Sequence, residues 1–161
     1  MKAIRIAAWA VALAMPWPAT AMAAGTASVD RGAHVAIIGG CHDCHTDGYA
    51  QTNGRVDPAK ALKGNPVGFQ GPWGTTYATN LRISIGGMSE DAFVQYARTF
   101  QTRPPMPWFN VHALDEDDSR SLYRYIKSLG EPGAPAPDYV PPGGRLTMPF
   151  IVFAPPTMPA R

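Results

Sequence analysis

The sequence Cys41-His42-Asp43-Cys44-His45 contains both cysteines of the chain, three positions apart, with a histidine directly after the second. One turn of helix brings the two sulfur atoms to the same side of the backbone and points the adjacent imidazole the same way. Two cysteines in an exported protein usually form a disulfide, but this spacing indicates another chemistry. The C-x-x-C-H pattern is typical of c-type haem attachment, in which the histidine ligates the iron.

Two other kinds of site share parts of this motif. A thioredoxin-type cysteine pair belongs in a βαβ context, and the sequence around the motif shows none. A structural zinc site needs four ligands, of which the motif supplies three, and the remaining histidines lack finger-like spacing. We therefore expect one haem c, bound covalently through Cys41 and Cys44 and ligated by His45.

Met106 is the candidate for the second axial ligand. It lies in Arg103-Pro104-Pro105-Met106-Pro107-Trp108, 61 residues after His45 (106 − 45), and the prolines stiffen this loop. A rigid loop presents a weak thioether ligand at little ordering cost, and His/Met is the usual ligation of cytochromes c. His112 is the main rival, whereas Met88 directly precedes a helix N-cap, as a packing residue does.

The identity of this ligand separates two classes of function. With His45 and Met106 both bound, the iron has no free position, and we expect an electron carrier that is not an enzyme. Without Met106, a five-coordinate haem would serve a sensor or an enzyme that binds a small ligand. The sequence contains no Ser/His/Asp set, paired carboxylates or phosphate-binding loop that favours another chemistry.

The N-terminus has the pattern of an export signal. Lys2 and Arg5 form a basic start, Ile6–Met15 is an apolar run, and Ala21-Met22-Ala23 is a small-x-small cleavage site. The run is too short to span a bilayer, so we expect a periplasmic or secreted protein, not embedded in the membrane after cleavage. Without Lys2 and Arg5, twelve basic residues (14 − 2) face twelve acidic ones, and the lack of a basic stripe argues against nucleic acid as a partner.

Two helices are predicted by apolar residues at i, i+3, i+4 and i+7. One follows the N-cap Ser89, and the other begins at Asp115 and stops at Gly130. A shorter apolar helix is expected over 29–40, running into the cysteine motif. Residues 46–80 are rich in Gly, Asn, Thr and Pro and lack a sustained period, so we expect mostly loop.

The last 31 residues, 131–161, contain nine prolines and no helical period, which predicts an extended or polyproline-like tail. Phe150-Ile151-Val152-Phe153 is an apolar patch within this tail. The patch either packs on the chain's own domain, since a free apolar tetrapeptide invites aggregation, or acts as a docking strand for a partner.

The order of these features resembles a class I cytochrome c, with the haem motif after a first helix, a methionine in a proline loop and a last helix. The resemblance covers residues 29–129. It implies an all-α fold of a few short helices around one covalent haem, in which the first and last helices cross, here near Gly32 and Tyr125. Together with the export signal and the Pro-rich tail, this resemblance predicts a signal peptide over 1–23, a cytochrome c domain over 24–130 and a Pro-rich C-terminal extension over 131–161.

A closer resemblance is to single modules of the cytochrome subunits of membrane-bound alcohol and gluconate dehydrogenases. Those subunits carry three C-x-x-C-H motifs and an anchor, whereas this chain has one motif and adds the Pro-rich tail. The resemblance implies an extracytoplasmic dehydrogenase as electron donor and a respiratory acceptor, with this chain as a free carrier or a fixed subunit. The segments that carry it are Gly71–Leu81, Met88–Phe93, Pro105–Pro107, Asp115–Asp118 and Leu122–Tyr125.

The class I resemblance also implies roles for side chains around the haem. His45 should donate its other ring nitrogen to a backbone carbonyl, and His42 and Asp43 should face solvent. The alternative for Trp73 and Tyr77 is that they fill the core. The side chains expected at the haem edge and its propionates are Trp73, Tyr77, Asn80 and Arg103.

Overall fold

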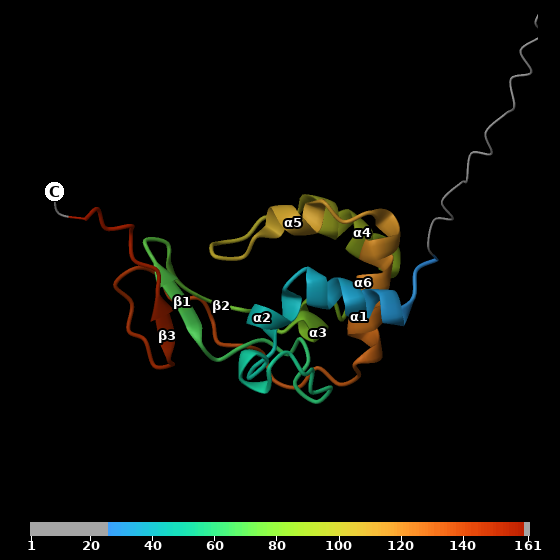
Figure 1. Ribbon diagram of the computed structural model, residues 1–161, viewed down its shortest axis with the longest axis horizontal. Helices are drawn as coiled ribbons and strands as arrows, with labels where there is room; N and C mark the ends of the chain where they lie inside the picture. Colours follow the sequence, from blue (N-terminus) through green and yellow to red (C-terminus); the bar gives the residue numbers. More distant parts are fainter. Residues whose placement is uncertain (1–25, 160–161) are drawn as a thin grey trace, which may run out of the picture.

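The computed structural model describes residues 26–159 as a helical body with a small sheet to one side (Figure 1). The expected signal peptide, residues 1–23, lies outside the described residues. Within the described part of the chain, no helix is both long and apolar enough to cross a bilayer. The elements are α1 (Val29–Ile38), α2 (Cys41–His45), the 3-10 turn η1 (Ala50–Thr52), β1 (Gly68–Gly71), β2 (Gly74–Tyr77), α3 (Leu81–Ser84), α4 (Glu90–Thr99), α5 (Trp108–His112), α6 (Glu116–Ser128) and β3 (Phe150–Val152).

The first and last helices, α1 and α6, cross and pack closely on the side of the helical body away from the sheet (Figure 1). Gly32 is buried at the crossing, where a Cβ would overlap the backbone carbonyl of Ser121 and lie 2.7 Å from Cβ of Tyr125. The backbone N–H of Ser28 donates to Oγ of Ser121 at 3.1 Å. The close approach of the helices therefore depends on glycine at this position, and it lies at the two residues that the sequence indicated.

Both predicted helices begin at the expected caps. Oγ of Ser89 accepts a hydrogen bond from the N–H of Ala92 at 3.1 Å, and Oδ1 of Asp115 accepts one from Asp118 at 2.6 Å. Each cap satisfies a backbone donor that the first helical turn leaves without a partner. The apolar faces of α1, α4 and α6 meet in a core of Val35, Ala36, Leu62, Ile85, Phe93, Ala97, Leu122, Tyr125 and Ile126.

A β-hairpin of β1 and β2 lies within residues 46–80, which the sequence predicted as mostly loop. The two strands pair antiparallel from Gly68 with Tyr77 to Gly71 with Gly74, where the chain turns. Gly74 has φ +98°, a conformation that favours glycine. The fold is therefore helical with a three-stranded sheet in the order β2-β1-β3, rather than all-α.

The Pro-rich tail is extended, as predicted, and its backbone binds both edges of this hairpin. On one edge, Val140 and Thr75 exchange two backbone hydrogen bonds of 2.8 and 2.9 Å. On the other edge, β3 pairs parallel to β1, with Phe150 opposite Gly68. The tail thus leaves the end of α6, passes one side of the hairpin and returns along the other.

The apolar patch Phe150-Ile151-Val152-Phe153 contacts the chain's own domain mainly through its backbone. The ring of Phe153 lies 6.0 Å from those of Phe69 and Trp73. The four side chains of the patch nevertheless remain 43–60% exposed. The strand pairing agrees with one of the two expectations, that the patch packs on the chain's own domain. Much of the apolar surface of the patch, however, stays uncovered.

A buried arginine that the sequence analysis did not single out ties the tail to the helical body. The Arg82 guanidinium donates to four backbone carbonyls, those of Pro58, Ala61, Leu129 and Glu131, at 2.6–3.1 Å. Burial lowers the pKa of Arg82, but arginine stays charged at any physiological pH. Its charge is thus matched by carbonyl dipoles, including that of Leu129 at the C-terminal end of α6.

Candidate functional site

The cysteine motif forms its own short helix, α2, directly after α1. Gly40 precedes it with φ +68°, which lets the chain turn sharply between the two helices. Cys41 and Cys44 are both half-buried and both free thiols. Burial raises the pKa of the Cys41 thiol to about 11, so the thiol is protonated at neutral pH. The motif therefore presents two unoxidised sulfur atoms from one helical turn.

His45, at the end of α2, is held in one orientation. Its Nδ1 lies 2.7 Å from the backbone carbonyl of Thr79, which can only accept, so Nδ1 carries the proton and Nε2 keeps its lone pair. Burial lowers the pKa of the imidazole, which favours the neutral form. A neutral imidazole with a free Nε2 is the form that ligates a metal ion.

His42 differs from the expectation that it faces solvent, because it is fully buried. Its Nδ1 lies 2.8 Å from Oγ1 of Thr46, and its Nε2 lies 3.3 Å from the hydroxyl of Tyr125. Both ring nitrogens are therefore engaged, and the side chain connects α2 to α6. Asp43, the other central residue of the motif, is exposed as expected.

The loop that carries Met106 contacts the hairpin. Oγ1 of Thr76, in β2, donates to the carbonyl of Pro104 at 2.7 Å. Met106 itself is half-buried, two residues further on. Because β2 leads directly to Thr79, which accepts from His45, one short segment of chain holds both the motif histidine and the methionine loop.

The two rivals for the sixth position have other partners. Nε2 of His112 lies 2.8 Å from the carbonyl of Phe100, so this nitrogen carries the proton and only Nδ1 keeps a lone pair. The His112 ring also packs against the rings of Phe100 and Trp108. Met88 packs against the edge of the core, and its carbonyl accepts from the hydroxyl of Tyr123 at 2.8 Å. Met88 therefore has the packing position expected of it.

Trp73, at the tip of the hairpin, has the most informative side chain of the four expected at the haem edge. Its Nε1 is the only buried side-chain nitrogen or oxygen without a hydrogen-bond partner among the residues that the structure describes. An unpaired buried N–H costs free energy, so its presence indicates an acceptor that is supplied from outside the chain. A haem propionate is an acceptor of this kind.

Asn80 is fully used within the protein. Its Nδ2 donates to the carbonyls of Pro132 and Ala134 at 2.8 and 2.9 Å, and its Oδ1 caps α3 through the N–H groups of Arg82 and Ile83. No side-chain N–H of Asn80 is left for a propionate. The structure instead places Asn80 as a link between α3 and the start of the tail.

The last two residues of this group, Tyr77 and Arg103, differ in burial. Tyr77 is 8% exposed and packs over Gly68, which agrees with the core-filling alternative. Arg103 is exposed, and its guanidinium carbon lies 3.9 Å from the ring centroid of Tyr139 in the tail. Tyr139 was not anticipated as a neighbour of the site, because nothing in the sequence around it marks it.

The described residues fit a covalently attached haem. They supply two free thiols on one helical turn, a histidine with a free Nε2, and a buried indole N–H without an acceptor. Residues 26–159 contain no cluster of three or more His, Cys, Asp or Glu side chains arranged to hold a metal ion on their own. The donor set therefore suits an iron that brings its own porphyrin nitrogens better than a structural zinc.

Comparison with known proteins gives two relatives. The chain is 31% identical over 152 residues to the fructose dehydrogenase cytochrome subunit of Gluconobacter japonicus, a match to 88% of this chain and 28% of that one. It is 30% identical over 136 residues to a nicotinate dehydrogenase subunit of Pseudomonas putida, a match to 73% of this chain and 11% of that one. No family model and no solved structure matches the chain.

Both relatives are subunits of dehydrogenases, and one is named as a cytochrome subunit. The resemblance to a cytochrome module of a dehydrogenase subunit, expected from the sequence, is therefore confirmed. The chain corresponds to a minor part of either relative, since it spans 28% and 11% of their lengths.

Proposed function

We propose that this chain transfers single electrons on one haem c, attached through Cys41 and Cys44 and ligated by His45 and Met106. The observation that carries the proposal is α2, which presents both free thiols and a histidine with an available Nε2. The relatedness to a cytochrome subunit supports the same cofactor. The close packing of α1 on α6 beside the motif helix supports a class I cytochrome c fold, to which the sheet and the tail would be additions.

The ligand set makes the protein a carrier rather than an enzyme. An iron with six bound ligands changes oxidation state without binding a substrate. A loop with prolines on both sides of Met106, attached to β2 through Thr76, keeps its position when the iron changes charge. Trp73 would then contact the haem, since its unpaired indole N–H would have a propionate as acceptor, whereas the side chain of Asn80 is fully used within the protein.

The proposed partner is an extracytoplasmic dehydrogenase that donates electrons, with a respiratory acceptor downstream. The two relatives support this, because each is part of a dehydrogenase. Export by the signal peptide over 1–23 would place the mature protein in the periplasm, where such a dehydrogenase is accessible. The formally neutral mature chain, with twelve basic and twelve acidic residues, predicts docking that depends weakly on salt.

Covalent attachment is tested by extraction of the purified protein with acid acetone. The colour should stay with the polypeptide, and the double variant Cys41→Ser, Cys44→Ser should release or fail to retain it, because no thioether can form. His34→Ala is the matched control, since His34 is exposed on α1 and should leave attachment unchanged. Free extraction of haem from the unmodified protein would overturn the c-type assignment.

A further inference from the structure

We propose that Tyr139, in the Pro-rich tail, is a positioning residue that holds the Met106 loop (residues 100–107) against the hairpin and so keeps the sixth position of the iron closed. The inference rests on the His45 and Met106 ligation of the proposed function. It assigns to the tail a role in ligation that goes beyond covering the domain.

Tyr139 contacts the loop and the hairpin at once. The guanidinium carbon of Arg103, three residues before Met106, lies 3.9 Å from the centroid of the Tyr139 ring, which is cation–π geometry. The hydroxyl of Tyr139 donates to the backbone carbonyl of Trp73 at 2.8 Å. One tail side chain thus connects the start of the Met106 loop to the turn of the hairpin.

The backbone of Tyr139 is itself fixed. The next residue, Val140, exchanges two backbone hydrogen bonds with Thr75. Gly74 lies so close beneath the tail that a Cβ there would be 2.5 Å from the carbonyl oxygen of Val140 and 2.9 Å from the Tyr139 ring. The Tyr139 ring is therefore held against the hairpin, so that its contact with Arg103 fixes the loop relative to the hairpin.

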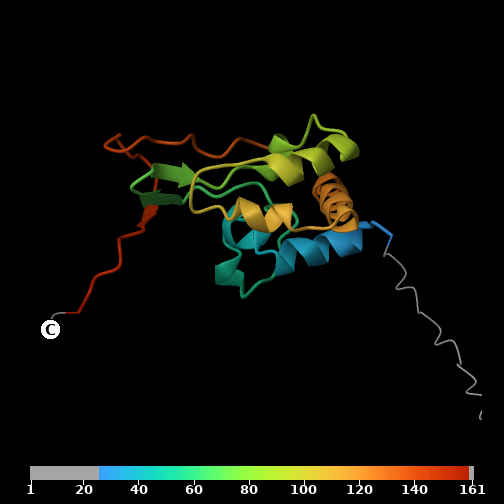
Figure 2. The same ribbon diagram turned by 90° about the horizontal axis from the view of Figure 1, so that it is seen from above.

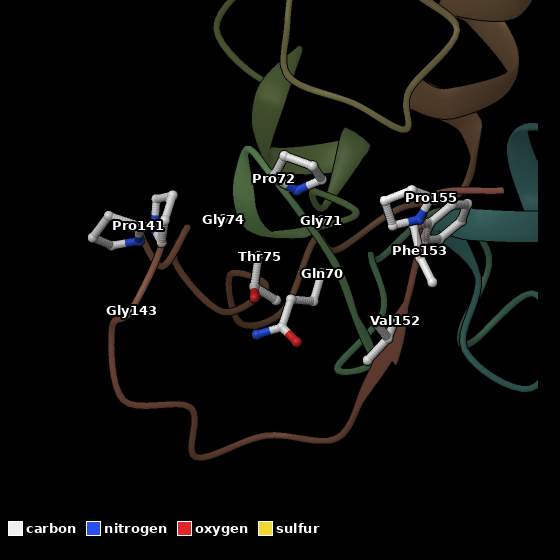
Figure 3. Close-up of a pocket in the computed structure, with 12 residues that line it drawn as sticks. Gln70, Gly71, Pro72, Gly74, Thr75, Pro141, Gly143, Val152, Phe153 and Pro155 are labelled. Atoms are coloured by element: carbon white, nitrogen blue, oxygen red, sulfur yellow. The ribbon is translucent and has the colours of Figure 1, made fainter. Parts of the chain in front are cut away.

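This attachment is separate from the pairing of β3. Between Val140 and β3 the tail arches away from the hairpin and borders an open cavity of about 380 Å³, which Gln70 and Thr75 also line (Figure 3). Pro141 lies on one side of this cavity and Val152 on the other. A change in β3 should therefore leave the Tyr139 contact in place, which provides a control within the same tail.

The loop needs such contacts because of its own sequence. Three of its eight residues, Pro104, Pro105 and Pro107, have no backbone N–H to donate. Its position then depends on side chains from outside, namely His112 on Phe100, Thr76 on Pro104 and Tyr139 on Arg103. A thioether is a weak iron ligand, so a loop that moves away even part of the time exposes the sixth position to competing ligands.

The test compares Tyr139→Leu and Tyr139→Phe with the unmodified holoprotein. Phenylalanine keeps the aromatic face for Arg103 but loses the bond to Trp73, and leucine loses both. Carbon monoxide binding to the ferrous protein should speed up by about tenfold in Tyr139→Leu and by less in Tyr139→Phe. The near-infrared sulfur-to-iron band should weaken in the same order, and amide hydrogen exchange over residues 100–107 should become faster.

Two further variants define the contact. Arg103→Leu should also speed up carbon monoxide binding, but by less than Tyr139→Leu, because the bond from Tyr139 to Trp73 remains. The double variant should add little to Tyr139→Leu, because the cation–π contact is already lost in that single variant. Phe150→Leu, in β3, should leave carbon monoxide binding, the band and exchange over 100–107 unchanged.

Different results would contradict the role of Tyr139 and the ligation by Met106. If Tyr139→Leu keeps the carbon monoxide rate and the exchange of residues 100–107 at the unmodified level, the inference is wrong while the proposed ligation stands. If Met106→Ala leaves the near-infrared band in place, the ligand assignment itself is wrong, and the inference falls with it.

Discussion

At the scale of single residues, the two histidines of the motif differ in how many of their ring nitrogens form hydrogen bonds. His42 and His45 are both buried, and burial lowers the pKa of each. His42 uses both nitrogens, one with Thr46 and one with Tyr125, so it has a purely structural position. His45 uses only Nδ1, which leaves Nε2 as the nitrogen able to bind iron.

The proposed ligation by Met106 gives the first prediction at this scale. Met106→Ala should abolish the near-infrared sulfur-to-iron band of the oxidised protein and lower the reduction potential by on the order of 100 mV, because a thioether favours ferrous iron. Met88→Ala is the matched control, since it removes a methionine that packs on the core. If Met88→Ala lost the band and Met106→Ala kept it, Met88 would be the iron ligand and Met106 would not.

Residue roles could be predicted from the sequence where the chemistry is local. Cys41, Cys44 and His45 are candidates because five consecutive residues define the pattern. The positions of Asn80 and Arg82 could not be predicted, because their partners are carbonyls far away in the sequence. Four of these carbonyls lie 47 to 54 residues further along the chain, and two partners of Arg82 lie 21 and 24 residues before it. The sequence alone does not distinguish a polar residue that contacts a cofactor from one that binds a distant backbone segment.

At the scale of elements, ion pairs link α4 to α6 next to the N-cap of α4. Glu90 accepts from Arg124 at 2.8 Å and from Arg120 at 3.1 Å. The hydrogen bond from Arg124, followed by that from Arg120, lowers the pKa of Glu90. The folded protein thus binds this proton more weakly than the unfolded chain does, so the pair stabilises the fold above the unfolded pKa and loses this contribution as pH falls through the folded pKa.

The second prediction follows from the lowered pKa of Glu90. Glu90→Gln should lower the free energy of unfolding by about 0.5–1 kcal/mol at pH 7, a small value because the pairs are partly solvated. The difference from the unmodified protein should shrink as the pH is lowered from 5 to 3. Urea unfolding at each pH measures it, with Glu131→Gln, an exposed glutamate, as the control. A difference that grows on acidification would contradict the assignment.

The long helices could be predicted from the sequence, whereas the short helices and strands could not. Helices α4 and α6 have ten and thirteen residues with a cap and a clear apolar period, and both begin where the sequence indicates. Helices α3 and α5 have four and five residues, too few to show a period. Strands β1 and β2 have four residues each, with glycines at Gly68, Gly71 and Gly74, so they show no alternation that would mark a hairpin.

At the scale of the whole molecule, the tail packs on the helical body and on the hairpin, although the sequence predicted a boundary between the domain (24–130) and the tail (131–161). Its first residues receive hydrogen bonds from Arg82 and Asn80, its middle pairs with β2, and β3 pairs with β1 (Figure 2). The prolines were sufficient to predict an extended conformation, because they exclude helix. The docking could not be predicted, because it depends on a hairpin that the sequence itself does not reveal.

The last prediction tests whether the tail belongs to the fold, by two truncations of the holoprotein. Removal of residues 131–161 leaves the buried donors of Asn80 without acceptors and exposes both edges of the hairpin, so the free energy of unfolding should fall by more than about 2 kcal/mol. Removal of residues 154–161 leaves all of these contacts in place, because the described residues after Phe153 are exposed and lie outside any strand. It should therefore change the free energy by less than about 0.5 kcal/mol. Urea unfolding followed by circular dichroism measures both, and equal stability of the two truncated proteins would show that the tail is only an appendage.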